Sequence, residues 1–131
     1  SFTHRHARHV VRQLDHAASV HRNAALAATD LRSRDFFSEL AEERSAFAAE
    51  WRSGLGEDEI PKSLPPKPRG GATFTSRQAL EEETRLLNLL QKIETDAPAR
   101  FQETCYFQRM AVSMAIELMN SAMRINPVSV P

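Results

Sequence analysis

The sequence predicts an all-α protein, an antiparallel four-helix bundle built from two helical hairpins that are joined by a long connection. Residues that favour helix, mainly Ala, Leu, Arg, Glu and Gln, dominate both halves of the 131-residue chain, and strand signals are absent. Apolar residues recur at steps of three and four, which is the period of an amphipathic helix. Prolines and glycines gather between Gly54 and Gly71, so the chain divides into two helical halves of one domain spanning 1–131.

The first hairpin is predicted from two apolar stripes. A helix over about 6–28 carries one stripe, formed by Val10, Leu14, Ala17, His21, Ala24 and Ala28. A second helix over about 33–53 carries another, formed by Phe36, Leu40, Phe47 and Trp51. Asp30 or Ser33 is expected to cap the start of this second helix, and Gly54 is expected to end it.

Residues 54–75 are predicted to form a long Pro-rich crossover between the second and third helices. The segment contains Pro61, Pro65, Pro66 and Pro68, which favour extended backbone. Lys62, Pro65 and Pro68 also match the spacing of a ligand for an SH3 domain. Two interpretations therefore stay open, a stiff linker or an adaptor segment whose Pro65 and Pro68 contact a partner protein.

The second hairpin is predicted over about 76–95 and 98–124. The third helix turns Ala79, Leu86, Leu90 and Ile93 inward, and Thr75 or Ser76 is expected to cap it. The fourth helix is apolar nearly all round, so it either packs centrally or meets a second subunit. We expect a homo-oligomer formed through this helix, with Met114, Met119 and Met123 at the interface.

Composition excludes some classes of function. Lys+Arg and Asp+Glu both number 17, and this zero net charge argues against a nucleic-acid binder and favours association. No apolar run approaches the length of about 20 residues that a membrane span needs. Cys105 is alone and cannot form an internal disulfide. No secretory signal is visible, so a cytoplasmic setting without membrane association is expected.

The segment from Phe36 to Trp51 resembles a helix of the ferritin family in which both metal-binding side chains are replaced. In ferritin-like di-iron proteins this helix carries Glu-x-x-His, and the matching pair here is Arg44 and Phe47. The first hairpin is also similar to small bacterial ferritin-like proteins of largely unknown function. That likeness rests on Leu14-Asp15-His16-Ala17-Ala18 and the residues that follow, and on Leu40-Ala41, Arg44 and Phe47-Ala48. The resemblance implies ferritin-like connectivity, with the long crossover between helices 2 and 3, and no catalytic residues to transfer.

Three polar residues stand on apolar stripes, and in a ferritin-like bundle they would all point inward. They are His21, Arg44 and Glu83. Buried charges need partners, so we hypothesise a buried polar cluster in which Glu83 pairs with Arg44 or His21. The cluster would either fix the register of the helices or serve binding or catalysis, and Arg44 could instead extend to the edge of the bundle.

The sequence favours a non-catalytic binding, scaffold or assembly protein with a ferritin-like bundle that lacks a competent di-iron centre, and no cofactor. The alternative is an atypical metal-handling ferritin-like protein or oxidoreductase, holding iron or zinc through His21, Glu43, Glu83 and Glu117. An inward Arg44 would repel such a metal. Near the N-terminus, His4, His6 and His9 alternate with arginines and are expected on the surface rather than at a metal site.

Overall fold

The computed structural model describes residues 3–56 and 72–125, with the side chains of residues 3–56 and 76–122. Four helices account for nearly all of these residues: α1 (His4–Ala27), α2 (Leu31–Leu55), α3 (Ala72–Glu94) and α4 (Ala99–Ile125). No strand occurs among them. The all-α prediction is thereby confirmed.

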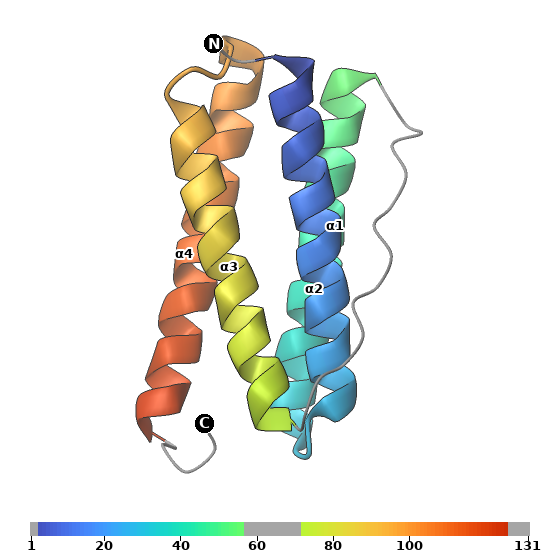
Figure 1. The fold of residues 1–131 in the computed structure, drawn as a ribbon, viewed down its shortest axis with the longest axis vertical. Helices are drawn as coiled ribbons and strands as arrows, with labels where there is room; N and C mark the ends of the chain where they lie inside the picture. The colour runs from blue at the N-terminus through green and yellow to red at the C-terminus, as the bar shows by residue number, and fades with distance from the viewer. Residues whose placement is uncertain (1–2, 57–71, 126–131) are drawn as a thin grey trace.

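The four helices lie side by side along one long axis (Figure 1). α1 begins at the end of the bundle where α2 ends, and α3 ends at that same end, where α4 begins. α1 packs against both α2 and α3, and α3 packs against α4. The contact between α2 and α4 is less extensive, so α4 is held mainly by α3.

The termini of α2 follow from its capping residues. The side chain of Asp30 accepts a hydrogen bond from the backbone N–H of Ser33 at 2.8 Å, as one of the two predicted caps. Gly56 follows the helix with φ of +67°, a left-handed conformation that favours glycine. The prediction that Gly54 ends the helix is wrong, because the left-handed cap comes two residues later.

The second hairpin differs from its prediction at the start. α3 begins at Ala72, so Thr75 and Ser76 lie inside the helix and do not cap it. α4 begins directly after Pro98, whose carbonyl accepts a hydrogen bond from the N–H of Phe101 at 2.8 Å. Residues 57–71, with Pro65 and Pro68 and most of the predicted crossover, lie outside the described residues.

Two apolar clusters fill the interior of the bundle. The first contains Leu14, Trp51, Leu86, Leu90 and Phe101 together with smaller side chains. The second contains Val20, Phe37, Leu40, Ala79, Ala115 and Met119, among others. Along α2, Arg44 lies between Leu40 of the second cluster and Ala48 of the first, and along α3, Glu83 lies between Ala79 and Leu86. Polar residues therefore interrupt the core where the two clusters meet.

The hydropathy of the helices was compared with that of membrane spans. Within the described ranges, none of the helices is both long and apolar enough to span a membrane.

Candidate functional site: a buried polar cluster

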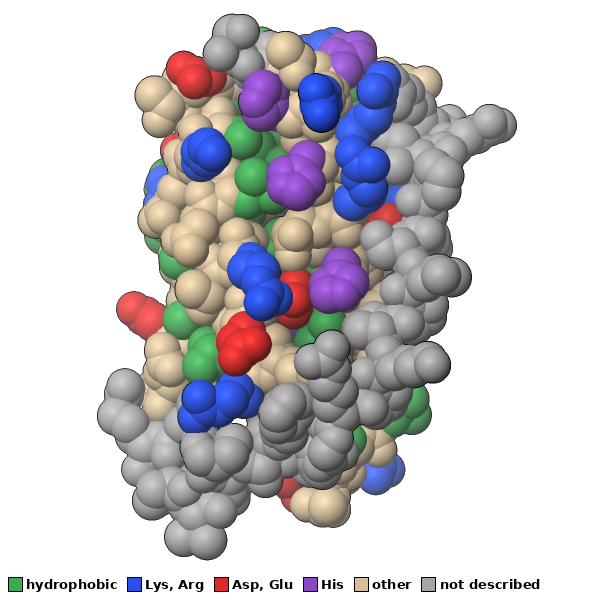
Figure 2. Space-filling model, in the orientation of Figure 1, with side chains coloured by type: hydrophobic (Ala, Val, Ile, Leu, Met, Phe, Trp, Pro, Cys, Tyr) green, Lys and Arg blue, Asp and Glu red, His purple; other side chains and the backbone are tan. Residues whose placement is uncertain are grey.

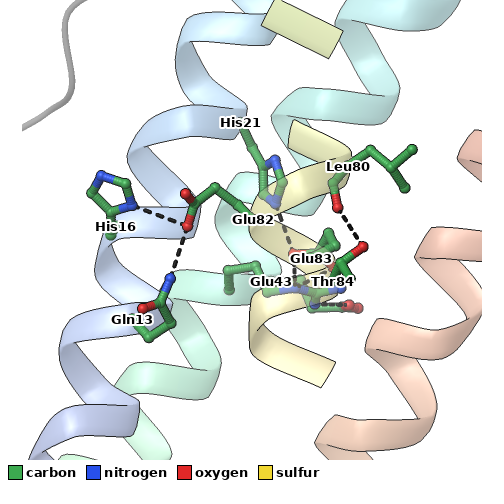
Figure 3. A network of polar contacts seen from close by, with 9 residues as sticks. Gln13, His16, His21, Glu43, Leu80, Glu82, Glu83 and Thr84 are labelled. Carbon is green, nitrogen blue, oxygen red and sulfur yellow. Dashed lines mark hydrogen bonds and ion pairs between the residues drawn. The ribbon is translucent and has the colours of Figure 1, made fainter. Parts of the chain in front are cut away.

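The structure brings His21 of α1, Arg44 of α2 and Glu83 of α3 into contact, and we call these three residues the buried polar cluster. Each residue has a relative exposure of 0%. Each stands at a position where helical periodicity turns the side chain inward, since the residues three and four positions away are apolar and are buried or partly buried. The three side chains therefore meet inside the bundle. Figure 3 shows His21 and Glu83 turned toward each other.

Glu83 is the centre of the cluster because both of its oxygens accept hydrogen bonds. Its Oε1 accepts from Nη2 of Arg44 at 2.7 Å, and Nε of Arg44 lies 3.1 Å from each carboxylate oxygen. Its Oε2 lies 2.9 Å from Nε2 of His21. An ionised carboxylate only accepts, so Nε2 of His21 carries the proton and donates it to this bond. The pair of Arg44 and Glu83 has the forked geometry that makes guanidinium–carboxylate bonds strong.

Arg44 is also bonded to a residue at the surface of the bundle. Its Nη1 donates to Oε1 of Glu43 at 2.6 Å, and the side chain of Glu43 is half exposed. The guanidinium lies over the ring of Phe47, 5.0 Å from its centroid. One cation thus links a buried carboxylate to an exposed one, and the expectation that Arg44 faces inward holds for its whole side chain.

The cluster shifts the pKa values of its charged members. Burial alone would raise the pKa of Glu83, but the hydrogen bonds from His21 and Arg44 and the charge of Arg44 outweigh it, and the pKa falls below the usual value. Burial would lower the pKa of Arg44, but Glu83 and Glu43 raise it overall. Both groups are therefore charged at neutral pH.

One atom of the cluster has no hydrogen-bond partner. Nδ1 of His21 is buried, and nothing in the described part of the chain bonds to it. In the tautomer that carries its proton on Nε2, Nδ1 is an unused acceptor. One face of the imidazole stacks near the ring of Phe37, with ring centroids 6.4 Å apart.

A second polar network lies beside the cluster, between α1 and α3. Glu82 is almost fully buried and accepts from Nε2 of Gln13 at 2.8 Å, and Nδ1 of His16 lies 3.1 Å from the same carboxylate oxygen. Arg85 completes the set through an ion pair with Glu82. Figure 3 shows Glu82 turned toward α1. Sequence reasoning singled out Glu83 and missed Glu82, although adjacent α3 residues on the side of α1 can both be buried.

Two further contacts between helices were also missed. Asp15 of α1 is buried and pairs with Arg52 of α2. The indole N–H of Trp51 donates to Oε1 of Gln108 on α4 at 2.7 Å, and Nε2 of Gln108 donates to the carbonyl of Phe47 at 3.3 Å. Such polar residues stand at the edges of apolar stripes, where a sequence pattern gives no sign of burial.

The residues at the centre of the bundle do not fit a di-iron centre. Such a centre needs several inward carboxylates and histidines. Here both oxygens of Glu83 are bonded to Arg44, and Glu43 is bonded to the same guanidinium. Glu117, the remaining member of the alternative metal set, is exposed on α4. Among the described residues, no group of three or more His, Cys, Asp or Glu is arranged to hold a metal ion.

The candidate interface residues have different positions. Met114 is 62% exposed on α4, whereas Met119 is buried in the second apolar cluster. Met119 is therefore unavailable to a partner, because its helical position turns it toward the bundle. The side chain of Met123 and both Pro65 and Pro68 lie outside the described residues.

The surface of α1 is rich in basic and imidazole groups near its start. Figure 2 shows His and Lys or Arg side chains gathered over the N-terminal half of this helix. His4, His6 and His9 are exposed, as are Arg5, Arg8 and Arg12. Neighbouring arginines oppose cation binding by these histidines.

Comparison with known proteins found no family model that matches this chain, and no curated protein or solved structure with detectable similarity to it.

Proposed function

We propose that this chain is a ferritin-like bundle without a competent di-iron centre, and that it works as a non-catalytic binding or assembly protein. The observation that carries the proposal is the complete burial of Arg44 with its guanidinium on Glu83. A fixed positive charge occupies the interior, where ferritin-like proteins hold metal cations. Repulsion between this charge and a cation works against metal-dependent chemistry.

The order of the helices supports the ferritin-like part of the proposal. α1 lies against α3 rather than against α4, and α2 ends at one end of the bundle whereas α3 begins at the other (Figure 1). A four-helix bundle with one long crossover in this position has ferritin-like connectivity.

The chemistry of the cluster supports a structural role for it. Glu83 is a charged acceptor already saturated by donors, and Arg44 is a permanent donor, so neither is poised to exchange a proton near neutral pH. A general acid or base also needs access to a substrate, and all three residues have 0% exposure. Function is then expected on the surface of the bundle.

Metal content tests the proposal directly. Untagged protein, purified without chelator and then incubated with Fe(II), Zn(II) or Cu(II), is expected to retain no stoichiometric metal by elemental analysis after desalting. The matched variants are Glu83→Ala in the cluster and His16→Ala on the surface of α1. Stoichiometric metal that disappears in Glu83→Ala and persists in His16→Ala would overturn the proposal in favour of the metal-handling alternative.

A gain of metal binding tests the ferritin-like register. The double substitution Arg44→Glu with Phe47→His restores the Glu-x-x-His pattern of ferritin-like proteins. We expect this variant, checked for helix content by circular dichroism, to bind Zn(II) at least stoichiometrically, together with His21 and Glu83. A folded variant without increased binding would contradict the assignment of this register.

A further inference from the structure

α4 exposes a set of large apolar side chains that the bundle does not cover. Their relative exposures are 46% for Tyr106, 60% for Phe107, 41% for Met110, 62% for Met114 and 57% for Leu118. We call these five residues the α4 apolar face. In the described part of the chain only two other large hydrophobic residues are exposed, Leu26 and Leu31, beside the turn between α1 and α2. Contiguous apolar surface of this kind marks an interaction site.

The spacing of the α4 apolar face places its members on one side of the helix. Phe107, Met110, Met114 and Leu118 follow one another at steps of three, four and four residues. Tyr106 packs edge-on against Phe107, with ring centroids 5.6 Å apart, and widens the face. The stripe extends along the helix for about 16 Å at 1.5 Å per residue. Aromatic residues and methionine are the types enriched at the centres of protein interfaces.

We propose that the occupant of the α4 apolar face is a second copy of this chain, with the two α4 helices antiparallel about a two-fold axis between Val112 and Ser113. This proposal rests on the proposed function and names the partner that the binding surface accepts. The stripe is close to self-complementary about that axis. Phe107 stands level with Leu118 of the second copy, and Met110 stands level with Ala115, next to Met114 of the second copy.

The charges beside the face favour the antiparallel orientation. Glu103 and Glu117 are exposed along the same side of α4. A parallel pair would set each of these carboxylates against its own counterpart, which is destabilising. The antiparallel pair sets Glu103 level with Ala122 of the second copy. In the same pair, Glu117 lies two residues along the helix axis from the level of Tyr106 of the second copy. The hydroxyl of that tyrosine can donate a hydrogen bond.

Overall electrostatics and area are compatible with this pairing. The zero net charge of the chain gives two copies no long-range repulsion. Aromatic side chains bury about 150–250 Å² each. At the observed exposures the five side chains then supply on the order of 500 Å² per copy, or about 1,000 Å² in total, which reaches the lower limit of specific interfaces.

The mass in solution is the first test. Sedimentation equilibrium of the full chain, from micromolar to hundred-micromolar concentration, is expected to give twice the 14.8 kDa of one chain. Phe107→Glu and Met114→Glu are each expected to raise the dissociation constant about 30-fold or more, as for a central interface residue. Leu26→Glu is the matched control, because it changes a residue of 82% exposure outside the face, and it is expected to leave the dimer intact. A wild-type monomer at all concentrations, or a dimer unaffected by Phe107→Glu and Met114→Glu, would overturn the proposal.

Disulfide cross-linking tests the orientation. Phe107→Cys and Leu118→Cys proteins are each oxidised alone and then as a mixture. The antiparallel pair predicts covalent heterodimer in the mixture and little cross-linking of either variant alone, since 107 and 118 face each other. If Phe107→Cys cross-links with itself and shows no preference for Leu118→Cys in the mixture, the antiparallel orientation is contradicted. The native Cys105 does not interfere, because it is fully buried and burial raises the pKa of its thiol to about 11.

The two proposals fail in different ways. A dimer that binds stoichiometric metal would overturn the proposed function and leave the pairing of α4 standing. A metal-free monomer would agree with the proposed function and would overturn the proposal that a second copy covers the α4 apolar face.

Discussion

Glu83 illustrates what one buried carboxylate does for a helical bundle. It holds Arg44 through both of its oxygens and also accepts a hydrogen bond from His21, so three helices meet at one side chain. Removing it leaves a guanidinium with 0% exposure and no carboxylate beside it except Glu43. An uncompensated buried charge is strongly destabilising.

The Glu83→Ala variant is therefore expected to lower the free energy of unfolding by about 3–5 kcal/mol. The neighbouring Glu81→Ala, at an exposed position of the same helix, is expected to leave that free energy nearly unchanged. Urea unfolding followed by circular dichroism measures both. Equal losses in the two variants would show that burial of Glu83 is not the cause.

Acid is expected to weaken the fold through the same carboxylate. The pKa of Glu83 is depressed in the folded protein, so its stabilising effect is present above the unfolded value of about 4.3 and is lost as pH falls through the folded pKa. In unfolding experiments between neutral pH and about pH 3, Glu83→Gln should show a smaller loss of stability than the wild type. Glu39→Gln, which alters an exposed carboxylate of α2, should keep the wild-type profile.

At the scale of the helix, two glycines near the end of α2 are required for different physical reasons. A Cβ atom at Gly54 would lie 2.8 Å from Cε1 of Phe101, so this position allows the close approach of α2 and Phe101. A Cβ atom at Gly56 would meet nothing within 4 Å, but its φ of +67° is unfavourable for most side chains. Glycine is therefore required at position 54 by the lack of space beside Phe101, and at position 56 by the left-handed backbone conformation.

Substitution at these glycines should separate the two effects. Gly56→Ala is expected to lower the free energy of unfolding by about 1–2 kcal/mol, and Gly56→Asn by less, because Asn tolerates the left-handed conformation. Gly54→Ala is expected to displace Phe101 from its stack on Trp51, where the ring centroids are 4.9 Å apart. Near-UV circular dichroism should change for Gly54→Ala and stay unchanged for both Gly56 variants. Loss of the same signal in Gly56→Asn would contradict this division.

At the scale of the whole molecule, the buried polar cluster separates two apolar clusters. Sliding one helix by a turn, about 5.4 Å, would place Arg44 or Glu83 against apolar side chains with no partner. The cluster therefore favours one alignment of α1, α2 and α3 over its neighbours. A well-packed apolar replacement would remove that preference without leaving a charge unpaired.

The triple variant His21→Leu, Arg44→Met, Glu83→Leu tests this role. Its free energy of unfolding is expected to match the wild type or exceed it by about 1–4 kcal/mol. Its amide resonances in two-dimensional NMR are expected to broaden or multiply, because several helix alignments become accessible. A triple variant with sharp, single resonances would show that the apolar clusters alone determine the alignment.

Much of the fold, but only part of the site, follows from sequence. The four helices are confirmed because their stripes are long and periodic. Helix ends differ by a few residues where local capping decides, as at Gly56 and Ala72. Periodicity turns His21, Arg44 and Glu83 inward, but it does not say which atoms bond. It gave no sign of Glu82 or Asp15, whose burial depends on the neighbouring helix covering the edge of a stripe.

The position of Trp51 gives the protein a built-in optical probe. It is the single tryptophan of the chain, it has 0% exposure, and its indole N–H is bonded to Gln108 at the limited contact between α2 and α4. An indole in apolar surroundings emits at shorter wavelength than one in water. Departure of α4 from the bundle, even with the other helices intact, should therefore appear as a red shift of intrinsic fluorescence before helix content is lost.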